Sequence, residues 1–294
     1  MIRQKSIKNF LFDAVIYIIL FLLMISCITP FIHIIALSFS SSAPAAAGMV
    51  GLWPIGFTLK SWAEVVAYND FWSSLWISIV RVVVGTSLSV FLVVITAYPL
   101  SKENREFKGR TAYVWFFFFT TLINGGLIPN YFLLSELNML NTIWALVLPG
   151  AMNVFNAILM LNFFRQLPKE LEEATFLDGA GYWTSLWKVV VPASKPSIAT
   201  ITLFTIVNHW NSWFDGLIYM NTPDKYPLQS YAQTVIATID TSNITAEDIR
   251  NMALFNDRTL RAAVIVVSAL PILIIYPFFQ KHLSQGIVIG SVKG

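Results

Sequence analysis

The sequence predicts an all-α membrane protein with six transmembrane helices. Hydrophobic residues make up 56% of its 294 residues and charged residues only 12%, about half the charged share of soluble domains. The mean hydropathy is +0.66. The apolar residues also gather in six long runs, and about 20 apolar residues are needed to cross a ~30 Å hydrocarbon core. So few charges cannot cover a water-facing surface, and the chain is therefore expected to lie in a membrane.

The six spans follow one another through a single transmembrane domain covering residues 1–294. We expect them at approximately 14–38, 72–100, 111–133, 142–164, 198–220 and 260–279. The first has no charged residue from Ala14 to Leu37, which is too long for the apolar part of a signal peptide, so we expect it to stay in place as a span. A long loop at 167–196 and a tail at 281–294 complete the domain.

Glycine and proline interrupt the third run. Gly125, Gly126 and Pro129 follow its apolar residues closely. We expect the helix to end there and residues 127–138 to form a short, partly buried element.

The basic residues predict the orientation. With a cytoplasmic N-terminus, the inner segments contain thirteen lysines and arginines: Arg3, Lys5, Lys8, Lys102, Arg105, Lys108, Arg110, Arg165, Lys169, Lys188, Lys195, Lys281 and Lys293. The outer loops contain four: Lys60, Lys225, Arg250 and Arg258. This excess on one side predicts that both termini are cytoplasmic.

Several classes of function are excluded by composition and motifs. A net charge of +3 is too small to indicate nucleic-acid binding, and the single cysteine, Cys27, excludes disulfides and cysteine-based metal sites within the chain. No G-x-x-x-x-G-K-[ST] occurs, so a P-loop does not bind ATP here. No H-E-x-x-H and no convincing nucleophile–base set appears. We therefore expect no catalytic residue, no metal site and no cofactor bound by this chain.

The loop 167–196 begins with signals for a short helix from Pro168 to Leu177. Proline suits the first turn of a helix, and Glu170, Glu172 and Glu173 favour the positive end of the helix dipole. Gly179 and Gly181 then stop the helix. A helix too short to span, placed on the cytoplasmic surface, suits a partner protein.

The same loop resembles the EAA motif of ABC-importer permeases. Glu173-Ala174-Thr175 is followed by three residues, Gly179, nine residues, and Val189-x-Val191-Pro192. Threonine replaces the second alanine of the family pattern, and valines replace isoleucine and leucine, but the spacing is intact. Further segments resemble the carbohydrate branch of this family, which includes the smaller permease of maltose systems. These segments are Asp178-Gly179-Ala180, Pro192-x-x-x-Pro196, Ala97 to Ser101, Gly125 to Pro129, Trp210 to Trp213 and Gly286 to Gly294.

The resemblance implies a type I ABC-importer permease whose loop forms a coupling helix in a cleft of the ATPase. Glu173 would meet a basic residue of the ATPase, and Gly179 would permit the turn after the helix. The expected docking residues are Glu172, Glu173, Ala174, Asp178, Gly179, Ala180 and Pro192. The implied partners are a second homologous permease, an ABC ATPase dimer holding ATP and Mg, and an extracellular or periplasmic solute-binding protein. The implied substrate is an oligosaccharide crossing the cell membrane.

The C-terminal tail has two readings. The resemblance implies that Gly290, Lys293 and Gly294 reach the interface of the ATPase dimer. A frayed terminus is the alternative.

Arg81 lies about ten residues inside the second expected span. A charge at that depth costs about 2.5–3.5 kcal/mol on insertion scales, so it needs a partner or a wet cavity. It either lines the translocation path or holds a gate closed, or it forms a structural pair with a carboxylate or carbonyl of the second permease or reaches the outer headgroups. We favour the structural alternative.

The fifth expected span carries a polar and aromatic cluster: Asn208, His209, Trp210, Asn211, Trp213 and Asp215. Aromatic faces, amides and carboxylates suit an oligosaccharide path. The alternative is an interfacial tryptophan belt with polar packing against the second permease. His209 by itself favours a structural role.

Two other functions were weighed. An ion-coupled secondary transporter needs intramembrane carboxylates or inverted repeats, but Asp215 is the only acid well inside a span and no repeat is visible. An intramembrane enzyme needs a charged constellation that the sequence lacks. The importer permease is the favoured function.

Overall fold

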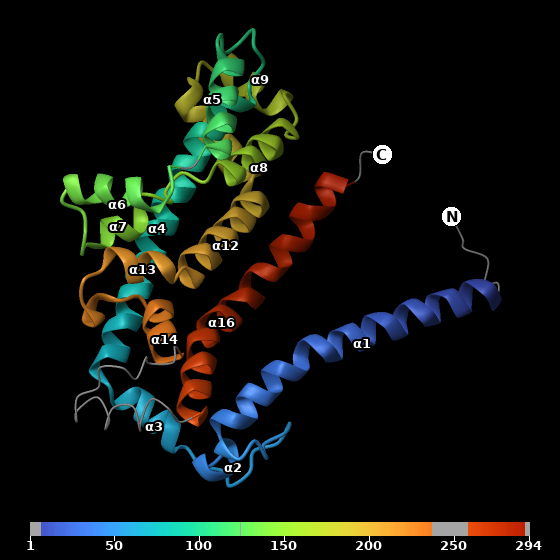
Figure 1. The fold of residues 1–294 in the computed structure, drawn as a ribbon. Helices are drawn as coiled ribbons and strands as arrows, with labels where there is room; N and C mark the ends of the chain where they lie inside the picture. The colour runs from blue at the N-terminus through green and yellow to red at the C-terminus, as the bar shows by residue number, and fades with distance from the viewer. Residues whose placement is uncertain (1–6, 124, 237–257, 292–294) are drawn as a thin grey trace. The chain divides into compact units, whose positions relative to one another are not determined.

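The computed structural model describes residues 7–123, 125–236 and 258–291, and every regular element in these ranges is helical (Figure 1). The chain forms two compact units. One contains Met1–Asn69 and Thr234–Ala269, and the other contains Asp70–Gln233 and Leu270–Gly294. We describe each unit by itself.

The first unit contains the long helix α1 (Ile7–Ser38), the short helices α2 (Ser42–Ala46) and α3 (Lys60–Ala67), and the beginning of α16 (Arg258–Ser291). From Phe10 onward α1 exposes apolar side chains on all sides, which is the pattern of a helix surrounded by lipid or protein. A hydroxyl–hydroxyl hydrogen bond of 2.7 Å between Ser61 and Thr259 joins α3 to α16.

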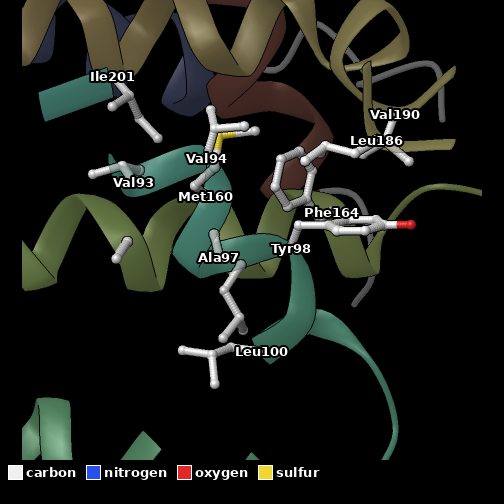
Figure 2. Packing of buried hydrophobic residues seen from close by; sticks show 12 residues of the cluster. Val93, Val94, Ala97, Tyr98, Leu100, Met160, Phe164, Leu186, Val190 and Ile201 are labelled. Carbon is white, nitrogen blue, oxygen red and sulfur yellow. The ribbon is translucent and has the colours of Figure 1, made fainter. Parts of the chain in front are cut away.

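The second unit is built on α4 (Asn69–Ser101). Its main core lies where α4 meets α8 (Val154–Arg165), α12 (Lys195–Asn211) and the π-helical segment η1 (Leu186–Val190). Small and β-branched side chains of α4 let these helices approach closely. Figure 2 shows the cluster: Val93, Val94, Ala97, Tyr98, Leu100, Ala157, Met160, Leu161, Phe164, Leu186, Val190 and Ile201.

The third expected span is a bent pair of helices, α5 (Arg110–Leu122) and α6 (Leu127–Glu136), which meet at 111°. Gly126 precedes α6 with φ +84°, a conformation that favours glycine. The predicted end of the helix near Gly125 is confirmed. The short element after it is an exposed helix, in which Leu134 is buried.

The fourth and fifth expected spans are interrupted. Residues 142–164 form α7 (Ile143–Val147) and then α8, because Pro149 and Gly150 do not continue a helix and Asn153 caps the next one by accepting a hydrogen bond from the Asn156 amide at 3.0 Å. Residues 198–220 form α12 and α13 (Phe214–Tyr219), with the break at Ser212.

Before α12, the chain runs through α9 (Glu170–Leu177), α10 (Tyr182–Ser185), η1 and α11 (Val191–Ala193). The segment Tyr182–Ala193 meets α12 at an angle of 82°. After α13 come the 3-10 turn η2 (Pro223–Lys225) and α14 (Leu228–Ile236).

The last helix is longer than expected. We predicted a span at 260–279 and a tail from 281, but α16 continues to Ser291 through Pro271 and Pro277. In the described ranges, α1, α4 and α16 are each long and apolar enough to cross a membrane, and counting the two bent pairs as spans gives five. The prediction of six spans with cytoplasmic termini thus stays a prediction.

Candidate functional site

The helix α9 ends in a Schellman motif. The Gly179 amide donates to the Phe176 carbonyl at 3.0 Å, and the Ala180 amide donates to the Thr175 carbonyl at 3.2 Å. Gly179 has φ +80°, which glycine adopts without strain. The predicted helix over Pro168 to Leu177, with its stop at Gly179, is confirmed to within two residues at its start.

Glu172 faces the protein. Its carboxylate pairs with the Lys102 ammonium and accepts hydrogen bonds from the hydroxyls of Tyr98 at 2.8 Å and Ser185 at 3.3 Å. The Lys102 nitrogen also lies 4.3 Å from the centre of the Tyr98 ring. This Glu172 network, consisting of Tyr98, Lys102, Glu172 and Ser185, fixes α9 to the end of α4 and to α10.

Glu173, the next residue, is exposed. Among the described residues, no hydrogen bond or ion pair of its carboxylate occurs within 4 Å. Other residues of the expected docking set are exposed as well: Ala174, Asp178, Gly179 and Pro192, with Ala180 half-buried. The apolar side chain of Leu177, 89% exposed, lies on the same short helix. The helix therefore presents a carboxylate and an apolar side chain together.

A second ion pair lies at the start of this loop. Lys169 pairs with Glu103, which follows α4. The hydrogen bond from Lys169 and its positive charge hold the pKa of the Glu103 carboxyl below its usual range, and Glu103 raises the pKa of Lys169. Both side chains are exposed, so water screens the pair and it stabilises the fold little.

Two apolar residues further along the loop are buried in the core. Leu186 and Val190 of η1 pack against α4 and α8, and the rings of Phe176 in α9 and Tyr182 in α10 meet edge to face with their centres 5.0 Å apart. The loop is thus one packed body, so a displacement of α9 would be transmitted to α4 and α8.

The second candidate site involves Arg81 of α4, which is 2% exposed. Its guanidinium pairs with the Asp215 carboxylate and donates to the Ser212 carbonyl at 3.1 Å. Asp215 also accepts from the Ser212 hydroxyl and the Gly216 amide, each at 2.9 Å. The arginine therefore has its partner within its own chain, at the break between α12 and α13.

A polar cavity of about 320 Å³ lies between α4, α8 and α12. Its lining includes Ser89, Asn153, Asn156, Thr205, Asn208 and His209, with Phe155 and Phe204 beside them. The Ser89 hydroxyl is buried and has no hydrogen-bond partner among the described residues. Gly85 makes room for His209, since a Cβ atom at Gly85 would lie 2.6 Å from the imidazole Nε2.

The predicted path residues are not gathered in this cavity. Asn208 lines it, whereas Arg81 and Asp215 form the ion pair, Trp210 is buried, and Asn211 and Trp213 are exposed. In the tail, Gly290 lies in the last turn of α16, and Lys293 and Gly294 lie outside the described residues.

Comparison with known proteins shows the family. Residues 8–289 match the family described as binding-protein-dependent transport system inner membrane component. The chain belongs to this family. It is 36% identical to the polygalacturonan/rhamnogalacturonan transport system permease protein YtcP of Bacillus subtilis over 98% of this chain and 100% of that protein. It is 42% identical to Protein LplC of the same organism over 94% of this chain and 93% of that protein.

A solved structure agrees with this assignment. A chain of a bacterial ABC transporter involved in the import of the acidic polysaccharide alginate superposes with a TM-score of 0.84 and 32% sequence identity, covering 94% of this chain and 98% of that one. The chain is a permease subunit of an ABC importer, in which the ATPase is a separate subunit. The ion-coupled alternative is not favoured.

In this permease, sequence reasoning missed the partners of two expected residues. Tyr98, Lys102 and Ser185 hold Glu172, and Asp215 holds Arg81. A basic residue directly after α4 and the acid in the fifth run were visible in the sequence. No spacing rule connects Glu172 with Tyr98 or Lys102, or Arg81 with Asp215, because these partners lie 70 or more positions apart. Ser185 is 13 positions from Glu172 and lies on a different helix, so this contact too is set by the fold.

Proposed function

We propose that this permease carries an oligosaccharide across the cell membrane, driven by a separate ATPase that docks on α9. Relatives named for polygalacturonan/rhamnogalacturonan transport and for alginate import support a carbohydrate substrate. The docking proposal rests on two features of α9. Its sequence has the spacing of the EAA motif, and Glu173 is exposed whereas the neighbouring Glu172 is paired with Lys102.

The proposed arrangement has six spans, with both termini in the cytoplasm. The excess of lysine and arginine in the segments beside α9 supports a cytoplasmic location for these segments. The chain would pair with a second homologous permease and work with an ABC ATPase dimer, which binds ATP and Mg, and with an extracellular or periplasmic solute-binding protein.

The proposed docking surface consists of Glu173, Ala174, Asp178, Gly179, Ala180 and Pro192, with Leu177 inserted into an apolar part of the ATPase cleft. Glu172, also expected there, would act indirectly, because its carboxylate orients α9. The tail from Gly290 to Gly294 is proposed to reach the ATPase interface.

Replacing Glu173 by lysine tests the docking. Charge reversal should place two cations against each other, so we expect substrate-stimulated ATP hydrolysis by the reconstituted complex to fall about tenfold or more, equivalent to ~1.4 kcal/mol or more. Glu170→Lys makes the same change at an exposed position of the same helix and should keep most of the activity. Equal losses in both variants, or normal coupling in Glu173→Lys, would contradict the assignment.

The polar cavity between α4, α8 and α12 is proposed as part of the sugar path. Amides and hydroxyls lie beside two phenylalanine rings, and such a lining suits the hydroxyl groups and C–H faces of a sugar. The unpartnered Ser89 hydroxyl gives the cavity a free hydrogen-bonding group.

Asn208→Ala tests the path. We expect the transport rate to drop about tenfold, because losing a hydrogen bond to a moving sugar costs ~1 kcal/mol or more, while complex assembly is preserved. Asn211→Ala is the matched control, since Asn211 is exposed but does not line the cavity. A larger loss with Asn211→Ala would place the path elsewhere. ATP-driven uptake of labelled substrate into vesicles that contain the complete complex measures both variants.

A further inference from the structure

An apolar groove of about 350 Å³ lies between α5 and α8, separate from the sugar cavity and from α9. Trp115 and Phe118 of α5 line one side, and Ile158 of α8 lines the other, all of them partly exposed. Phe118 lies eight positions after Arg110 in α5, which is roughly 12 Å of helix. That length is close to the ~15 Å of one leaflet of the hydrocarbon core.

Two arginines lie at one end of the groove. Arg110, the first residue of α5, and Arg165, the last residue of α8, both line it. The Arg110 Nε donates to the Leu100 carbonyl at 2.7 Å, and the Arg165 Nε donates to the Ser101 carbonyl at 3.3 Å. Consecutive carbonyls at the end of α4 thus hold the two guanidinium groups close together.

These contacts leave most of the donors unused. A guanidinium has five N–H donors, and among the described residues the terminal nitrogens of Arg110 and Arg165 make no hydrogen bond or ion pair. Capping the end of α4 therefore accounts for one donor of each arginine. The planar forks that remain match the oxygens of a phosphate.

No ion pair to Arg110 or Arg165 occurs among the described residues, although both arginines also line an adjoining cavity with four glutamates. Glu172 is paired with Lys102, and Glu103 is paired with Lys169. Glu106 and Glu173 face the adjoining polar cavity, but neither comes within 4 Å of a guanidinium nitrogen. The mouth of the groove thus holds two guanidinium groups that form no ion pair, beside an apolar surface.

We propose that this groove binds an anionic phospholipid of the cytoplasmic leaflet, with its phosphate on Arg110 and Arg165 and one acyl chain along Trp115, Phe118 and Ile158. Both arginines belong to the segments that the charge bias assigns to the cytoplasmic side, and basic pockets between helices on that side suit anionic headgroups. The site requires only that the chain lies in a bilayer, and it depends on neither the sugar path nor the ATPase docking.

The test uses the complete importer complex purified from vesicles of phosphatidylcholine and phosphatidylglycerol, with retained lipid counted by native mass spectrometry. The double variant Arg110→Gln/Arg165→Gln should retain phosphatidylglycerol about tenfold less than the unaltered complex, because both charge-assisted contacts are lost. Arg105→Gln/Lys108→Gln removes the same charge from exposed positions of the neighbouring loop and should retain lipid normally.

A second variant probes the apolar part. Ile158→Trp fills the groove without changing charge and should also lower retention, which keeps the test valid if the double arginine variant does not assemble.

Unchanged retention in both variants would overturn the proposal. So would displacement of the lipid by inorganic phosphate alone, which would indicate a simple anion site. Efficient cross-linking of an Ile158→Cys/Cys27→Ser variant to the second permease in lipid-saturated complex would overturn it too, because the groove would then be a subunit interface.

Discussion

Glu172 and Glu173 are neighbours in the sequence, but their side chains have different surroundings. Successive residues of an α-helix point about 100° apart, so one carboxylate reaches Tyr98 and Lys102 while the other is exposed. The first residue orients the helix within the protein, and the second is available to a partner. The sequence motif alone did not separate these roles.

Replacing Glu172 by glutamine tests the inward role. The neutral amide leaves Lys102, whose side chain is 9% exposed, without its counter-ion. We expect the complex to lose about 2 kcal/mol of stability. This is less than the cost of breaking a fully buried ion pair, because Glu172 is partly exposed. Thermal unfolding of the complex measures this loss.

Glu170→Gln is the matched control for this change, as an exposed glutamate on the same helix. It should change stability by less than about 0.5 kcal/mol. Equal stabilities of the two variants would show that the Glu172 network does not hold α9 in place.

Arg81 is a buried charge whose need for a partner could be predicted from the sequence. Its depth in an apolar run predicted that it needed a partner, and the favoured alternative was a structural pair with the second permease. The expected location of that partner was wrong: Arg81 pairs with Asp215 and the Ser212 carbonyl of its own chain. The need for a partner follows from the cost of burying a charge, whereas the identity of the partner follows only from the break between α12 and α13.

At the scale of elements, α9 and η1 form the connection between the proposed docking surface and the core. The Schellman motif ends α9 at a fixed point, and Leu186 and Val190 then enter the cluster with α4 and α8. A glycine with positive φ is the single residue that makes this reversal without strain.

Gly179→Ala tests the reversal. A Cβ atom at Gly179 meets nothing within 4 Å, so the cost is backbone strain alone, about 1 kcal/mol. We expect reduced stability and weaker ATPase coupling. Gly181→Ala is the matched control, because Gly181 has φ −87° and equally open space.

The two alanine substitutions should have different effects on the stability of the complex, since only Gly179→Ala is expected to lower it. Gly181→Ala should be neutral or stabilising by up to about 1 kcal/mol, because alanine restricts the unfolded chain. Unfolding midpoints of the two purified complexes give the comparison. A neutral Gly179→Ala would mean that the turn relaxes into another conformation.

At the scale of the molecule, the three proposed interactions use different surfaces. The ATPase is proposed to dock on α9, the sugar to pass through the cavity between α4, α8 and α12, and a lipid to bind the groove between α5 and α8. All three lie around the core of the second unit, where α4 and α8 contribute to more than one of them.

The sequence by itself determined the membrane class, the short helix of the 167–196 loop, its glycine stop and the family. These features rest on composition, on local spacing and on residues close together in the chain. The tertiary structure decided where the expected helices break, how far α16 extends, and which distant residues pair with Glu172 and Arg81. Hydropathy averages over a long run and does not detect the interruptions of two and six residues that separate α12 from α13 and α7 from α8. Contacts between residues far apart in sequence exist only once the helices have packed.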